Sequence, residues 1–178
     1  WHAIMYFLII MIALRWKPSK RFFLSFISLP LFSVAFFAWN SGNPFNGTLF
    51  TLQAAFVLIN GLRATTEKII FSEKMFVTAG IIMLVFGLVY PHFLETVNIF
   101  KYLYASPFGL IPCPTLSVVI GFMLVFRGFG SKHAMLILTA AGLFYGLFGV
   151  FKLGVYIDFV LILGALMMGV GYVRRRFF

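Results

Sequence analysis

Seven apolar stretches divide this chain, and each approaches the length that a helix needs to cross a lipid bilayer. A spanning helix uses roughly 20 mostly apolar residues, because each residue advances about 1.5 Å along the axis. The stretches are residues 3–14, 22–39, 45–62, 76–94, 115–126, 134–151 and 155–173. Hydrophobic residues make up 62% of the chain and charged residues 10%, whereas soluble domains are roughly half apolar and a quarter charged. The sequence therefore predicts an all-α fold, a transmembrane helical bundle of about seven spans that forms one domain over residues 1–178.

The basic residues alternate between the connections. Of the 14 Lys and Arg residues, all but Lys101 and Lys152 follow the first, third, fifth and seventh stretches. Basic loops stay in the cytoplasm, so we expect the C-terminus inside the cell and Trp1 outside. The net charge of +10 then reflects topology, and no nucleic-acid partner is expected.

The first stretch is short, and its basic flank follows it. A secretory signal peptide has its basic residues before the apolar run, so we expect a membrane anchor here instead. Because the chain opens at Trp1 rather than at a methionine, a clipped first span is one interpretation of its length.

A single cysteine, Cys113, limits the chemistry that the chain can support. It excludes a disulfide and a Cys-cluster metal site within one chain. Cys113-Pro114 is similar to the intramembrane Cys-Pro element of heavy-metal pumps, but a second cysteine and an ATPase domain are missing. We therefore expect neither a metal ion nor another cofactor. No phosphate loop, nucleophile elbow or paired-carboxylate site is present either, so no catalytic residues are predicted.

Three prolines, Pro107, Pro112 and Pro114, precede the short fifth stretch. Proline lacks an N–H group and breaks a helix interior, but it suits the first helical position, where we place Pro114. The preceding backbone is then expected to dip into the outer leaflet, where it must be buried in protein or line a watered cavity. Two interpretations stay open: a tight turn that docks Phe108 and Ile111 between helices, or a functional site at Cys113 and Thr115.

Polar residues inside or beside the spans form two further groups. Asn46, Gln53 and Asn60 lie seven residues apart and so share one stripe of a helix, which must face other helices or water. The stripe acts either as a link between helices or as the lining of a polar path. On the outer side are His92, Glu95, Lys152 and Asp158. Lys152 and Asp158 form a structural ion pair in one interpretation, and the group handles protons or a ligand in the other.

The longest outer connection and the glycines carry weaker patterns. Residues 91–104 alternate apolar and polar positions at helical spacing, which predicts a partly helical segment in the outer interface. An irregular loop with aromatic anchors is the alternative.

Small residues recur at helical spacing in the last two stretches. Gly142, Gly146 and Gly149, with Ala165 and Gly169, indicate close helix packing within the bundle or between protomers.

Three short motifs resemble those of a known family. They are Leu52-Gln53-Ala54-Ala55-Phe56, Tyr90-Pro91, and Pro107-Phe108-Gly109 followed by Pro112-Cys113-Pro114-Thr115. From about Phe22 onward, the chain resembles a bacterial integral membrane protein family that carries domain-of-unknown-function number six-zero-six-four. The resemblance implies a multi-pass helical fold in the bacterial inner membrane and supplies no activity.

The patterns together favour a membrane protein that binds or passes a small solute or ion at a site in its outer half. The candidate ligand-binding residues are Gln53, Asn60, His92, Glu95, Cys113, Thr115 and Asp158. A non-catalytic scaffold or subunit that packs against a partner membrane protein, or against a second copy, is the alternative, and a membrane enzyme comes third. A cavity that reaches Gln53 or Cys113 would favour the solute-binding function. A fully packed bundle would favour the scaffold function.

Overall fold

The computed structural model describes residues 1–93 and 98–174, and over these ranges the chain is helical, with no β-strand. The α-helices are α1 (His2–Ala13), α2 (Lys20–Asn40), α3 (Pro44–Arg63), α4 (Lys74–Val89), α5 (Tyr102–Ala105), α6 (Pro112–Val125), α7 (Lys132–Leu147) and α8 (Phe159–Val173). Shorter elements are the 3₁₀ turns η1 (Ile99–Lys101), η2 (Arg127–Gly130) and η4 (Tyr156–Asp158), and the π-helical η3 (Phe148–Lys152), which continues α7.

Four helical segments in the described part of the chain are long and apolar enough to cross a membrane. They are Lys20–Asn40, Pro44–Arg63, Lys132–Lys152 and Tyr156–Val173. The helices α1, α4 and α6 are also apolar but shorter, between 10 and 17 residues. Each of the seven predicted stretches thus contains a helix, which confirms the all-helical fold with membrane-length helices. The count of seven spans stays a prediction.

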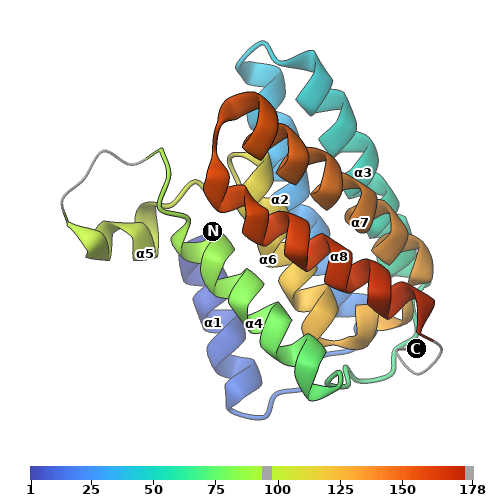
Figure 1. The fold of residues 1–178 in the computed structure, drawn as a ribbon. Helices are drawn as coiled ribbons and strands as arrows, with labels where there is room; N and C mark the ends of the chain where they lie inside the picture. Colours follow the sequence, from blue (N-terminus) through green and yellow to red (C-terminus); the bar gives the residue numbers. More distant parts are fainter. Residues whose placement is uncertain (94–97, 175–178) are drawn as a thin grey trace.

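Helix pairs build the bundle, and α6 lies at its centre. The most extensive contacts join α2 to α3, α4 to α6, and α7 to α8 (Figure 1). Every residue of α6 from Pro114 to Val125 is buried. Glycines bring α4 against it, because a Cβ on Gly80 would lie 2.6 Å from the carbonyl oxygen of Gly121. Such close backbone approach is how helices pack without a hydrophobic driving force between them.

Local signals at the helix starts explain where the helices begin. The Ser19, Asn43 and Ser131 side chains accept hydrogen bonds from backbone N–H groups in the first turns of α2, α3 and α7, which satisfies donors that a helix leaves unpaired. The prediction that Pro114 starts its helix is wrong by two residues. Helix α6 begins at Pro112, and a second proline fits within its first turn because N–H groups there have no intrahelical partner.

The basic connections meet at one end of the bundle, which we call the basic end. The N–H of Ile69 donates to the carbonyl of Pro18 (3.0 Å), and the N–H of Arg127 donates to the Ser72 hydroxyl (2.9 Å). Arg174 forms an ion pair with Glu73 at 3.9 Å. The alternation of basic residues along the chain therefore corresponds to one end in space. The opposite end, which we call the distal end, holds the α2–α3 and α7–α8 connections and the start of α6.

An exposed ion pair also lies at the basic end, where Lys20 donates to Glu67 at 2.5 Å. The hydrogen bond and the positive charge of Lys20 lower the pKa of the Glu67 carboxyl.

The connection between α4 and α6 is partly helical in its described residues. Helix runs from Ile99 through α5, which projects from the side of the bundle (Figure 1). The hydroxyl of Tyr6 donates to the carbonyl of Leu103 at 2.6 Å and ties this segment to α1. Residues 94–97 of this connection, Glu95 among them, lie outside the described residues.

Candidate functional site

A cavity of about 260 Å³ opens at the distal end between the start of α3, the residues after α4, the start of α6, the end of α7 and the start of α8. Its deepest wall is formed by Tyr90 and Asp158, each 1% exposed. Its rim includes Phe93 and Leu153, which are 61% and 60% exposed. The cavity therefore runs from the distal surface to a buried acid.

Asp158 occupies an unusual position for an acid at a helix start. It is the residue before α8, but its side chain makes no capping hydrogen bond to that helix. Instead, the Tyr90 hydroxyl donates to Asp158 Oδ1 at 2.7 Å. A Cβ on Gly149 would overlap Asp158 Oδ2, so the glycine leaves room for the carboxyl group. The acid is thus turned away from its own helix and toward the cavity.

No cation pairs with Asp158 among the described residues. The ion pairs found in the described part of the chain join Lys20 to Glu67 and Arg174 to Glu73, and both lie at the basic end. Lys152, which the sequence suggested as a partner, is exposed on η3 and forms no ion pair with it. His92 is near enough to act on Asp158 electrostatically but lies beyond ion-pair distance.

Two more polar groups, a thiol and an amide, line the cavity wall. Cys113 lies in the first turn of α6, half-buried, with its thiol 3.9 Å from the carbonyl oxygen of Tyr145. Cys113 and Asp158 line the same cavity. Across the cavity, the Tyr145 hydroxyl donates to Asn46 Oδ1 at 2.9 Å and so links α7 to α3. The amide stripe predicted on the third span therefore contributes its first member to this wall.

The Pro-rich turn has a packed part and a part that lines the cavity. Phe108 is buried and packs edge-on against Trp1 and His2. Thr115 is fully buried beneath the turn, where its hydroxyl accepts from the N–H of Gly109 (2.9 Å) and donates to the carbonyl of Ile111 (2.8 Å). The first half of the turn is therefore packing, whereas Ile111, Pro112 and Cys113 line the cavity. Thr115 holds the turn and does not face the cavity.

Gln53 does not share the Cys113 cavity, contrary to the prediction. It lines a neighbouring, mostly apolar groove of about 600 Å³ between α3 and α7, which shares Phe45, Phe144 and Tyr145 with the cavity. The physical reason is helical rise, since seven residues from Asn46 carry Gln53 about 10 Å along the axis. Gln53 is only 7% exposed, and its Nε2 has no hydrogen-bond partner among the described residues.

The remaining predicted residues lie elsewhere. Asn60 is at the basic end, where Nδ2 donates to the carbonyl of Phe56 (2.8 Å) and Oδ1 accepts from the Ser131 hydroxyl (3.1 Å). Asn60 therefore links α3 to the start of α7, which agrees with the interpretation of the stripe as a link between helices. His92 is half-buried, with its ring 6.4 Å from that of Tyr90, just outside the cavity. Glu95 lies outside the described residues.

Sequence reasoning missed three residues of the site. Tyr90 was not among the candidate ligand-binding residues, although the proline after it signals the end of a helix. Gly149 was assigned to a helix-packing face, but in the structure it accommodates the Asp158 carboxyl. Tyr145 carried no signal, because an aromatic residue in an apolar helix is ordinarily packing.

The lining suits a small, positively charged or hydrogen-bond-donating ligand. Carboxyl, phenol, thiol and amide oxygen groups converge on it, and Phe45, Phe144 and Phe148 add aromatic faces that attract cations. Within the described residues, no cluster of three His, Cys, Asp or Glu side chains could hold a metal ion. The volume lies just below the range of drug-sized pockets, roughly 300–1,000 Å³, so the ligand is expected to be small.

No family model matches this chain, and no curated protein or solved structure does so either. The resemblance to the bacterial membrane family, which rests on short motifs, therefore stays a prediction.

Proposed function

We propose that this protein is an integral membrane protein that binds a small cationic solute in the Asp158 cavity, on the outer side of the bacterial inner membrane. The observation that carries the proposal is a buried carboxyl group that faces a cavity and lacks a cationic partner among the described residues. The orientation follows from the basic end, because basic loops stay in the cytoplasm and the cavity lies at the other end.

The energetic reason is the cost of burying an acid. Removing a carboxylate from water costs several kcal/mol unless nearby groups compensate it. Tyr90 supplies one hydrogen bond to the acid. A cation in the cavity would supply the missing charge, and ring faces at the wall would add cation–π attraction. Acids within membrane spans are rare and generally mark ligand or ion sites.

Binding is better supported than passage across the membrane. The Asp158 cavity and a cavity of about 500 Å³ at the basic end, next to Asn60, share no lining residues. Between the two ends lies α6, whose side chains are buried from Pro114 to Val125. Passage would require a second arrangement of α6, so we restrict the proposal to binding and treat transport as a separate question for flux measurements.

The test compares thermal unfolding of the purified protein with that of Asp158→Asn in lipid nanodiscs. The probes are sodium, ammonium, methylammonium and tetramethylammonium chloride at equal ionic strength. A bound cation stabilises the folded state by about 2.7 kcal/mol at 100 times its Kd. We expect at least one probe to raise the melting temperature of the wild type and to have little effect on Asp158→Asn. The amide oxygen can still accept from Tyr90, so this variant should fold.

Glu73→Gln provides the matched control, because it removes an acid from the exposed ion pair with Arg174 at the basic end. It should keep the response to the cation. If no probe distinguishes the wild type from Asp158→Asn, Asp158 is a packing residue and the scaffold function takes precedence.

A further inference from the structure

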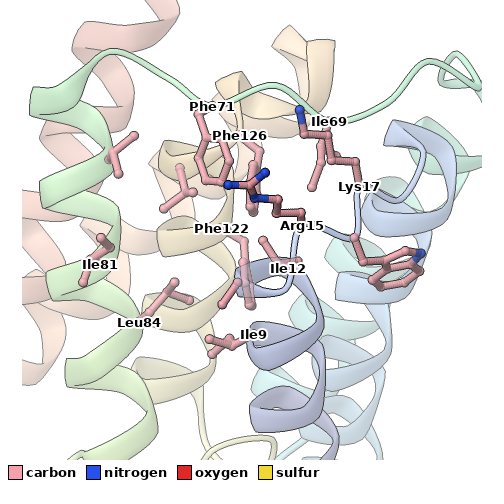
Figure 2. A pocket seen from close by; sticks show the side chains of 14 residues that line it. Ile9, Ile12, Arg15, Lys17, Ile69, Phe71, Ile81, Leu84, Phe122 and Phe126 are labelled. Atoms are coloured by element: carbon pink, nitrogen blue, oxygen red, sulfur yellow. The ribbon is translucent and has the colours of Figure 1, made fainter.

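A groove of about 780 Å³ runs between α1 and α4 at the basic end, with α6 as its floor. Figure 2 shows apolar side chains from all three helices lining it, among them Ile9, Ile12, Ile81, Leu84 and Phe122. Helix α4 packs closely on α6, whereas backbone contacts between α1 and α4 are sparse, which leaves the groove unfilled by protein. The groove shares no lining residue with the Asp158 cavity.

Two cationic side chains, Arg15 and Lys17, stand at the basic mouth of this apolar groove (Figure 2). Both are exposed, and neither forms an ion pair with a described residue. The chain has 14 basic residues and only 4 acidic ones, so few of its cations can pair with an acid of the chain itself. At the basic end, Glu67 and Glu73 are already engaged. A ligand that matches the whole site must therefore be apolar along its length and anionic at one end.

The backbone at Arg15 adds an independent observation. Helix α1 ends with the N–H of Trp16 bonded to the carbonyl of Met11 and the N–H of Arg15 bonded to that of Ile12, a Schellman motif. Arg15 occupies its left-handed position, with φ of 71°, where glycine is the usual residue. An arginine held in this strained conformation directs its charge over the groove (Figure 2). Such strained residues cluster at sites that contact ligands.

We propose that an anionic glycerophospholipid occupies this groove, with an acyl chain between α1 and α4 and its phosphate between Arg15 and Lys17. The volume is within the range of small-molecule sites, roughly 300–1,000 Å³. Basic pockets between helices at the cytoplasmic face are suited to anionic lipid headgroups. The proposal stands apart from cation binding at Asp158, because neither site contributes a residue to the other.

The test measures lipid binding to the purified protein by native mass spectrometry. Phosphatidylglycerol and phosphatidylcholine with identical acyl chains are the two probes. We expect the wild type to bind the first phosphatidylglycerol molecule more tightly than the first phosphatidylcholine. Replacing Arg15 and Lys17 by glutamine should weaken phosphatidylglycerol binding by about fivefold for each charge removed, and leave phosphatidylcholine binding unchanged. Arg15→Lys should retain the preference.

Two control variants separate the site from general charge effects. Lys152→Gln removes an exposed cation at the distal end and should leave both affinities unchanged. Ile81→Trp fills the groove from α4, where Ile81 is half exposed, and should weaken binding of both lipids. Equal wild-type affinity for the two lipids would overturn the proposal. So would an equal effect of Lys152→Gln, or unchanged binding in Ile81→Trp, which would place the lipid on the surface rather than in the groove.

A third variant distinguishes lipid binding from folding. Arg15→Gly relieves the left-handed strain and removes the charge. We expect it to be at least as heat-stable as the wild type in detergent without added lipid, while losing preference for phosphatidylglycerol. Retention of that preference by a stable Arg15→Gly protein would show that Arg15 does not contact the phosphate and would refute the proposed geometry.

Discussion

Gly149→Ala tests whether the Asp158 carboxyl is held in place by the space that glycine leaves. In the structure, a Cβ at this position overlaps Asp158 Oδ2, so the carboxyl group must rotate. Rotation breaks the 2.7 Å hydrogen bond from Tyr90. A hydrogen bond to a charged group is worth about 1.5–3 kcal/mol, and alanine recovers up to about 1 kcal/mol of helix propensity. We therefore expect Gly149→Ala to lower the free energy of unfolding by about 1–2 kcal/mol.

A double-mutant cycle with Tyr90→Phe makes this reasoning refutable. The phenylalanine removes the same hydrogen bond, at a cost of about 1–3 kcal/mol. If both substitutions act on one bond, the double variant should be destabilised by much less than the sum of the two. The assay is equilibrium unfolding in mixed detergent micelles, followed by circular dichroism. Gly169→Ala is the control, since its nearest neighbour would lie 3.5 Å away and only helix propensity changes. Additive effects at Gly149 and Tyr90 would mean that the glycine does not position Asp158.

Three further results are expected. Gly80→Ala should destabilise the bundle by about 1–3 kcal/mol in the same unfolding assay, because its Cβ would lie 2.6 Å from the backbone oxygen of Gly121, whereas Gly169→Ala should be neutral or stabilising. A membrane-impermeant thiol reagent added outside intact cells should label Cys113, and more slowly when a stabilising cation is present; labelling only after denaturation would show that the cavity is closed. Reporter fusions after Tyr104 and at the C-terminus should report opposite compartments, and the same compartment for both would contradict the seven-span topology.

The helices were predictable because a bilayer allows few solutions. Apolar runs without charge leave the backbone no partner except itself, so each run becomes a helix. The alternating basic residues likewise predicted which connections would meet, and hydrogen bonds such as Ile69 to Pro18 confirm that they do. The start of α6 was placed two residues late, because Pro112 and Pro114 are both compatible with a first turn and sequence spacing does not choose between them.

The candidate site was less predictable, since it depends on which faces of different helices meet. Cys113 and Asp158 were both among the candidate ligand-binding residues, and the structure brings them to one cavity. Gln53 was assigned to the same cavity from its stripe, but a stripe gives a direction around the helix and not a distance along it. Tyr145 belongs to the site and donates a hydrogen bond to Asn46. The two residues are 99 positions apart in the sequence, so no local pattern predicts this contact.

The acids show why the two ends of the bundle differ in chemistry. Glu67 and Glu73 lie on the surface of the basic end, and each has a cation beside it, so their removal from the chain would change little beyond surface charge. Asp158 is buried at the opposite end, where it accepts a hydrogen bond from the Tyr90 hydroxyl and has no cation beside it among the described residues. An apolar residue there would avoid the desolvation cost of the acid but would leave the buried Tyr90 hydroxyl without its acceptor. The proposed cation gives a reason for an acid at this position, and this inference fails if Asp158→Leu binds every cation as the wild type does.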